Sequence, residues 1–260
     1  MILHSQIIGE GKPFIILHGL LGMGDNWKTL ARQFSLLGFE IHLVDQRNHG
    51  RSFHSDEFNY ELLANDLYNY CKHHGLADLL LLGHSMGGKT AMQFATEHPD
   101  MVSKLLVADI APKAYPQHHQ DIFKALLSLD FERIKTRGEA EEVLSKYIKE
   151  AGIRQFLLKN LYWKEKGVLG LRANLEILNR EIEEVGKPLP ENAIYTGATL
   201  FLAGANSGYI NAMDEILIKK HFPAASIVTI SNAGHWLHAE NPKEFYDRVT
   251  RFISGEDTEG

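Results

Sequence analysis

A serine set between two glycines is the residue of this chain with the clearest potential for chemistry. Ser85 lies within the segment 83–87, Gly-His-Ser-Met-Gly, which follows the apolar run Leu79–Leu82 and precedes a helical pattern. The apolar run predicts a buried strand. A strand that passes into a helix at one residue holds that residue at a strained, positive φ, and only glycine fits beside it. This turn would expose the Ser85 hydroxyl and place the Met86 N–H at a helix N-terminus, where it can bind an oxyanion.

The G-x-S-x-G pattern in this context is typical of the nucleophile turn of α/β-hydrolases, with a plain glycine-rich turn as the alternative. A neutral hydroxyl is a weak nucleophile and needs a general base. His235 is the best-placed base, because it follows the last expected strand, 226–230, on a glycine-bearing loop at the same sheet edge. His49 and His238 are weaker candidates. We expect His84 to shape the cleft, since adjacent side chains on an extended turn diverge.

The base in turn needs a carboxylate that fixes its tautomer and stabilises the imidazolium. In this fold the acid commonly follows the strand expected at 199–203, but the loop 204–208 carries no carboxylate. Asp109 ends the strand 102–108, which should neighbour the serine strand, so it can reach the imidazole by another route. We predict Asp109 as the acid, with Asp214 as the alternative.

A loop near the N-terminus is expected to complete the oxyanion site. The strand 14–17 runs into a glycine-bearing loop at the carboxyl edge of the sheet, where α/β active sites collect. The backbone N–H of Leu20 is the expected second donor. We expect His18 and Asp45 to brace their loops by hydrogen bonds, and Asn48 to adopt the left-handed conformation that glycine usually fills.

Composition excludes several classes of protein. The chain has 260 residues, 44% of them apolar, and a formal net charge of -6 with no basic run, which argues against nucleic-acid and anionic-membrane partners. Its single cysteine, Cys71, falls on an apolar helical stripe and is expected to be a buried small hydrophobe. No segment is typical of a signal peptide or a membrane span, so we expect a cytoplasmic protein. No metal or organic cofactor is expected.

Alternating strands and helices predict a mostly parallel sheet flanked by helices, an α/β class of fold. The exception is 112–195, where amphipathic helices are expected and no strand. We therefore expect a core formed by 1–111 and 196–260, with 112–195 inserted as a helical cap after the strand 102–108. Because the insertion starts at the edge that carries Ser85, it should cover the cleft.

Helix ends give further expectations. Asp25 should cap a helix, Thr136 and Glu139 should form a capping box, and Asn241 should cap the last helix. The polar tail 255–260 should fray.

Aromatic residues of the insertion are candidates for the substrate pocket. Phe156, Tyr162 and Trp163 lie close together in the sequence. The simpler interpretation is that they pack the insertion on the core. The alternative is that some of them line an acyl pocket.

Several segments resemble the bacterial YbfF-type esterases, and the resemblance covers essentially the whole chain. The segments are 47–52, 83–89, 109–112, 204–209 and 234–240. The resemblance implies an α/β-hydrolase fold and a small carboxylesterase that acts on short acyl esters, sometimes on acyl-CoA thioesters. It also implies an acid at the position of Asp109.

The resulting hypothesis is a serine esterase that forms an acyl-enzyme on Ser85, with a small acyl ester as its partner molecule. A perhydrolase or carbon–carbon hydrolase could use the same serine. A non-enzymatic ligand-binding protein that kept the fold is a rival of a different class. Dehalogenases and epoxide hydrolases of this architecture attack with an aspartate, and Ser85 occupies that position, which argues against both.

Overall fold

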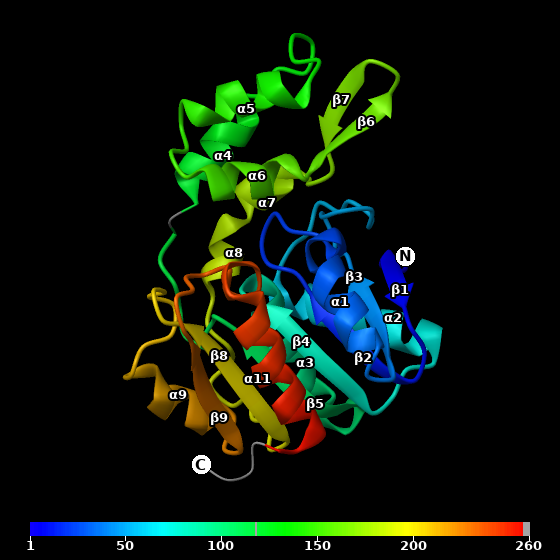
Figure 1. The fold of residues 1–260 in the computed structure, drawn as a ribbon, viewed down its shortest axis with the longest axis vertical. Coiled ribbons are helices and arrows are strands. Elements are labelled where there is room, and N and C mark those ends of the chain that lie inside the picture. Colours follow the sequence, from blue (N-terminus) through cyan, green and yellow to red (C-terminus); the bar gives the residue numbers. More distant parts are fainter. Residues whose placement is uncertain (118, 257–260) are drawn as a thin grey trace.

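In the computed structural model, which describes residues 1–117 and 119–256, a seven-stranded sheet runs through the core (Figure 1). The strand order is β1-β3-β2-β4-β5-β8-β9, and every pairing is parallel except that of β1 with β3. The bounds are β1 Ser5–Ile8, β2 Lys12–Leu17, β3 Phe39–Val44, β4 Leu79–His84, β5 Val102–Ala108, β8 Ala198–Gly204 and β9 Ala225–Ile230. The mostly parallel sheet expected from the sequence is confirmed.

Helices cover both faces of this sheet because both faces are apolar. Successive side chains of a strand point to opposite faces, so Phe14 and Ile16 of β2 pack on one side while Ile15 and Leu17 pack on the other. The first side is covered by α1 (Lys28–Ser35) and α11 (Pro242–Ser254). The second is covered by α2 (Tyr60–His74), α3 (Met86–Glu97) and α9 (Asp214–His221). The leucine strand β4 is buried along its whole length.

Short helical turns complete the core. They are the 3-10 turns η1 (Gly24–Trp27) and η2 (Pro99–Met101) and the helix α10 (Leu237–Glu240).

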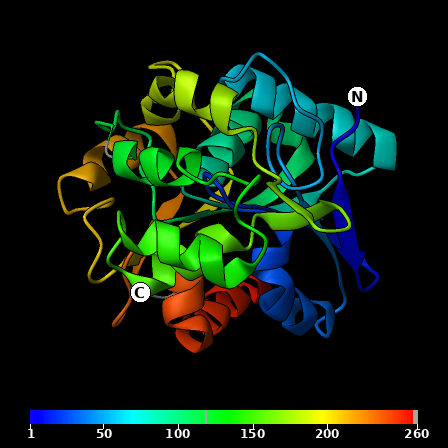
Figure 2. The ribbon, with the colours of Figure 1, turned by 90° about the horizontal axis from the view of Figure 1, so that it is seen from above.

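The segment between β5 and β8 forms a separate layer above the carboxyl ends of the parallel strands (Figure 1). Seen from above, its helices overlie the sheet (Figure 2). Its elements are α4 Gln120–Leu127, α5 Arg137–Ser145, α6 Ala151–Leu158, β6 Leu161–Glu165, β7 Val168–Leu171, α7 Leu175–Arg180 and α8 Ile182–Gly186. Leu126, Leu144 and Leu157 belong to a third apolar cluster that also takes in Leu21 and Met86 of the core.

The expectation that this segment contains no strand is wrong. β6 and β7 pair as an antiparallel hairpin, and Gly167 at its turn has φ 82°. The hairpin is short and half exposed, so it lacks the long apolar run that marks the strands of the core. Leu171, which lies in the part of the chain expected to be helical, ends β7 instead.

Helix ends were partly as expected. The Thr136–Glu139 capping box forms, and Asn241 accepts a hydrogen bond from the N–H of Glu244. Asp25 is not a cap: the helical segment starts after Met23, and the carboxylate of Asp25 pairs with Lys28. Of the tail 255–260, residues 257–260 lie outside the described part of the chain. Among the described residues, no helix is both long and apolar enough to cross a membrane.

Candidate active site

The nucleophile turn has the strained geometry that the glycine spacing predicts. Ser85, between β4 and α3, has φ 53° and ψ −120°. A Cβ on Gly83 would lie 2.1 Å from the carbonyl oxygen of Gly87, and a Cβ on Gly87 would lie 2.5 Å from that of His18. Both distances are far inside van der Waals contact. The backbone therefore closes around Ser85 only because these positions lack side chains.

Three residues from distant parts of the sequence meet at the carboxyl edge of the sheet. His235, on the loop after β9, has Nε2 2.9 Å from Ser85 Oγ and Nδ1 2.8 Å from Asp109 Oδ2. A carboxylate only accepts hydrogen bonds, so the proton between Asp109 and the ring sits on Nδ1. Nε2 is then free to accept the Ser85 proton. The structure thus brings together all three residues that the sequence singled out.

Asp109 is completely buried and fixed by further donors. The N–H of Gly204 donates to Oδ1 at 2.9 Å, and the hydroxyl of Ser207 donates to Oδ2. The backbone N–H of Asp109 donates to the carbonyl oxygen of Leu202 at 2.8 Å, which extends the hydrogen bonding between β5 and β8. The backbone φ of Asp109 is 50°. These contacts give the buried carboxylate its hydrogen-bond partners and hold Oδ2 against the imidazole.

The rival acid lies elsewhere, and His84 supports the loop that carries the base. Asp214 accepts from Lys113 Nζ at 2.6 Å and from the N–H of Asn211 at 2.8 Å, so it serves the start of α9 and not the imidazole. His84 donates from Nε2 to the carbonyl oxygen of His235 at 2.7 Å and therefore fixes the loop that carries the base. Burial, with His238 and His235 nearby, holds the pKa of His84 well below its usual range, so the ring is a neutral donor.

Tyr209 is a site residue that the sequence reasoning missed. Its ring stacks on the imidazole of His235, with centroids 3.8 Å apart and planes 15° apart. Burial raises the pKa of Tyr209 to about 12, so the phenol is neutral. It belongs to the segment 204–209 that carries the family resemblance, which was the one available signal. The stack limits rotation of the base.

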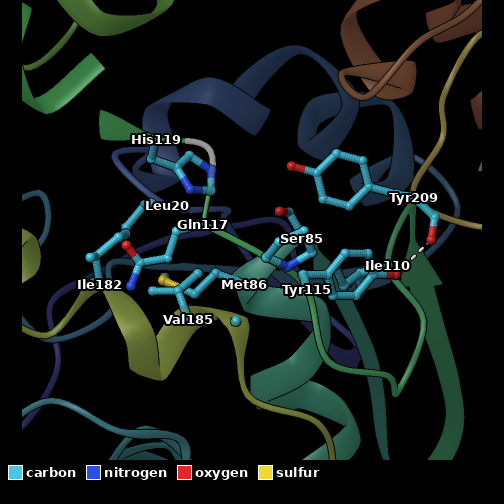
Figure 3. Close-up of a pocket in the computed structure, with 12 residues that line it drawn as sticks. Leu20, Ser85, Met86, Ile110, Tyr115, Gln117, His119, Ile182, Val185 and Tyr209 are labelled. Atoms are coloured by element: carbon cyan, nitrogen blue, oxygen red, sulfur yellow. Dashed lines mark hydrogen bonds between the residues drawn. The ribbon is translucent and has the colours of Figure 1, made fainter. Parts of the chain in front are cut away.

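The expected oxyanion donors line the same cavity as Ser85. Leu20 and Met86 form part of its wall, with Tyr115 and Tyr209 opposite (Figure 3). A Cβ on Gly19 would lie 3.2 Å from the Cβ of Ser85, which shows how closely the loop before Leu20 approaches the serine. Leu20 and Met86 thus lie beside Ser85, and their role as oxyanion donors stays a prediction.

The loops behind this wall are braced as expected. His18 accepts from the N–H of Gln46 at 3.0 Å, while Asp45 accepts from the N–H groups of Gly24 at 2.7 Å and Arg51 at 2.9 Å. Asn48 has φ 63°, the left-handed value predicted from the sequence. Both oxygens of Asp45 thus bind loop N–H groups, which makes it a structural carboxylate.

The larger cavity at Ser85 has a volume of about 320 Å³ and is mostly apolar. Among its lining residues are Ile122, Ile153, Phe156, Leu157 and Trp236. A second cavity of about 490 Å³ adjoins it and shares Ile153, Phe156 and Trp236. The rings of Phe156 and Trp236, with centroids 5.9 Å apart, stand between the two spaces.

Of the three aromatic pocket candidates, the structure places one at the cavity. Phe156 lines it, as described above. Trp163 lies on the hairpin strand β6 with 56% of its surface exposed, and Tyr162 packs against the guanidinium of Arg172 at 4.5 Å. The tentative assignment of Trp163 and Tyr162 to the pocket is therefore wrong. Both residues belong to the hairpin strand β6, and neither lines the cavity at Ser85.

Within residues 1–117 and 119–256, no group of three or more His, Cys, Asp or Glu side chains is arranged to hold a metal ion. Cys71 is buried among apolar side chains, and burial raises the pKa of its thiol to about 12. It is the inert hydrophobe expected from the sequence.

Comparisons with known proteins agree with this geometry. Residues 12–137 match the family model described as alpha/beta hydrolase fold. The mouse sn-1-specific diacylglycerol lipase is 39% identical over 247 residues, covering 92% of this chain and 80% of the relative. Esterase YbfF of Escherichia coli is 31% identical, covering 94% of each chain. A solved structure titled marine microorganism esterase superposes with a TM-score of 0.94 at 44% identity, covering 96% of this chain and 99% of the other. The chain belongs to the α/β-hydrolase family.

Proposed function

We propose that the protein is a serine carboxylesterase that hydrolyses short-chain acyl esters through an acyl-enzyme on Ser85. Membership of the wider class, carboxylic ester hydrolases, accords with relatives named esterase and diacylglycerol lipase. The observation that carries the finer proposal is the hydrogen-bonded series Ser85–His235–Asp109, opening onto an apolar cavity of about 320 Å³. That volume is near the lower end for small-molecule pockets and suits a short acyl chain.

The catalytic cycle follows from the proton positions. His235 Nε2 takes the proton of Ser85 as Oγ attacks the ester carbonyl, and Asp109 stabilises the imidazolium. The N–H groups of Leu20 and Met86 hold the tetrahedral oxyanion, each contributing about 3 kcal/mol to lowering the barrier. The imidazolium then gives its proton to the leaving alcohol. Water, deprotonated by His235, then attacks the acyl carbonyl; the bond from the acyl carbon to Ser85 Oγ breaks, the carboxylic acid leaves, and the imidazolium returns its proton to Oγ.

We further propose that 112–195 acts as a cap domain on a core of 1–111 and 196–260. Supporting this division, the inserted elements lie above the strand ends and supply Ile122, Ile153 and Phe156 to the cavity (Figures 1 and 2). The cap would then set the size of the acyl group. Acyl-CoA thioester hydrolysis and a cytoplasmic location remain predictions from the sequence.

The test is an assay of p-nitrophenyl acetate and butyrate with wild-type protein and Ser85→Ala. We expect the wild type to turn over both esters and the variant to lose at least about 10⁴-fold in kcat/KM, because the nucleophile is removed. Equal rates for the two proteins would defeat the esterase proposal. Extending the series to longer esters and to acyl-CoA defines the acyl group, and a non-enzymatic ligand-binding protein would turn over none of them.

A further inference from the structure

The nucleophile helix carries a buried lysine that has no part in the mechanism above. Lys89, in the first turn of α3 four residues after Ser85, is 1% exposed. An ammonium group is strongly hydrated in water, so its burial requires compensation. Burial lowers the pKa of Lys89 to about 7. Its partners show what the compensation is.

The ammonium of Lys89 is bound by main-chain carbonyl groups from both connections of the inserted segment. Nζ donates to the carbonyl oxygen of Lys113 at 2.9 Å on the outgoing connection. On the returning connection it donates to the carbonyl oxygens of Gly186, at 3.3 Å, and Lys187. Three carbonyl groups match the three donors of an ammonium group. A lysine of the core thus ties together the two points where the insertion leaves and rejoins it.

The two connections also bind each other. The N–H of Tyr115 donates to the carbonyl of Gly186 at 2.8 Å, and that of Leu189 donates to the carbonyl of Pro112 at 3.0 Å. The ring of Tyr115 lies 4.9 Å from the Lys89 ammonium, within cation–π range. Lys89 therefore fixes the position of Tyr115 as well as the connections.

Tyr115 continues the contacts to the base. Its hydroxyl accepts from the N–H of Ala111 at 2.8 Å and donates to the carbonyl of Tyr209 at 2.6 Å, the interaction drawn in Figure 3. The rings of Tyr115 and Tyr209 also stack, with centroids 5.3 Å apart. Tyr209 in turn stacks on His235 at 3.8 Å. A continuous series of contacts therefore runs from the Lys89 ammonium to the catalytic imidazole.

We propose that Lys89 is a positioning residue that clamps both connections of the inserted segment and so holds Tyr115 and Tyr209 against the ring of His235. The proposal rests on the proposed esterase function for its kinetic readout. It assigns the nucleophile helix two tasks: the first turn presents Ser85 to the cleft, and the same turn anchors the cap. Orientation of the base thereby depends on correct seating of the cap.

The first experiment compares Lys89→Met with a matched control. Lys104 also donates to two carbonyl groups, those of Phe252 and Ile253, and lies over the ring of Phe252, but it is remote from the cleft. We expect Lys89→Met to lower kcat for p-nitrophenyl butyrate about tenfold with KM changed by less than about threefold, because small misplacements of a catalytic group have such effects. Lys104→Met should lower the melting temperature and leave kcat within about twofold. Equal kcat in Lys89→Met and wild type would overturn the proposal.

Tyr115→Phe tests the second half of the series without removing a charge. It removes the hydrogen bond from the Tyr115 hydroxyl to the carbonyl of Tyr209 and should also lower kcat. The double variant Lys89→Met/Tyr115→Phe should have the same kcat as Lys89→Met alone, because substitutions within one network are not additive. Multiplicative effects would contradict the proposal. If Lys89→Met does not fold, an unchanged kcat in Tyr115→Phe would overturn it instead. Lys89→Arg, which retains charge and donors, should keep more activity than Lys89→Met.

A readout without ester turnover separates this inference from the proposed function. The proton between His235 Nδ1 and Asp109 should give a low-field NMR resonance in wild type that shifts or broadens in Lys89→Met but not in Lys104→Met. If wild type fails to hydrolyse any ester, the esterase proposal fails while this resonance still tests the clamp. An identical resonance in Lys89→Met and wild type would refute the clamp alone.

Discussion

The carboxyl edge of the sheet and the inserted segment above it build one cleft by different means. At the sheet edge, Ser85 and Asp109 follow directly on the neighbouring strands β4 and β5, and His235 lies on the loop after β9, so the ends of parallel strands determine where each residue lies. In the inserted segment, cavity residues such as Ile153 and Phe156 are placed by how α6 docks on the core. The reacting groups are therefore positioned by strand ends and the turns that follow them, whereas the pocket depends on tertiary packing.

The two aspartates of the core should differ strongly in their importance for kcat. We predict that Asp109→Asn lowers kcat about 10⁴-fold, because the amide no longer holds the correct imidazole tautomer. Asp214→Asn should leave kcat within about threefold, since its carboxylate serves Lys113 and Asn211. Steady-state kinetics on p-nitrophenyl butyrate decides this. A larger loss in Asp214→Asn would show that the acid is misassigned.

Alanine substitutions of Gly83, at the sheet edge, and Gly152, in the inserted segment, should change the free energy of unfolding in opposite directions. Gly83→Ala should lower the free energy of unfolding by about 3 kcal/mol or more, because its Cβ would overlap the Gly87 carbonyl at 2.1 Å. Gly152→Ala, in α6, meets no atom within 4 Å and should raise it by about 0.5–1 kcal/mol through helix propensity. Denaturant unfolding measures both. A tolerated alanine at 83 would mean that the turn is less tightly closed.

A buried histidine of the core should make the free energy of unfolding depend on pH. Burial lowers the pKa of His238 to about 3, so between pH 6.5 and about 3 the unfolded chain binds a proton that the folded protein does not. The free energy of unfolding should therefore fall as the pH drops below 6.5, by about 1.4 kcal/mol per pH unit for this group. His238→Phe, which can still stack on Trp27, should make the pH dependence shallower by that amount. His73→Gln, at an exposed position of α2, is the control, and equal slopes in wild type and His238→Phe would contradict the prediction.

The smallest expected effect concerns acyl length and compares two aromatic residues of the insertion. Phe156→Ala should raise the ratio of octanoate to butyrate hydrolysis about tenfold, because it opens the cavity of about 320 Å³ into its neighbour of about 490 Å³. Trp163→Ala should leave the ratio unchanged, since that side chain is 56% exposed on β6. A chain-length profile with p-nitrophenyl esters measures both. A shift in Trp163→Ala alone would place the pocket elsewhere.

The same contrast governs what could be predicted from the sequence. The left-handed turn at Asn48 and the strained serine turn were predictable because they depend on a few consecutive residues. Asp109 could be selected because the loop after β8 carries no carboxylate, and parallel strands bring their carboxyl ends together. These features depend either on a few consecutive residues or on the parallel arrangement of the strands.

The rest depends on contacts between distant segments. Tyr209 stacks on His235 only because the loops after β8 and β9 are adjacent, which no periodicity reveals. The β6–β7 hairpin is too short for a clear pattern, although its Lys166-Gly167 turn was a usable signal. Trp163 was misplaced because an apolar side chain need not be buried. The contacts of the buried Lys89 likewise could not be predicted, because they form only when both connections of the insertion lie against the core.

The most direct test of the central claim is to identify the side chain that reacts. The protein would be incubated with a fluorophosphonate and the adduct located by peptide mass spectrometry, in wild type and in His235→Gln. We predict a single adduct on Ser85 in wild type, formed at least about 10³-fold more slowly in His235→Gln because the serine loses its base. An adduct on another residue, or an equal rate in both proteins, would contradict the assignment of Ser85 and His235 as nucleophile and base.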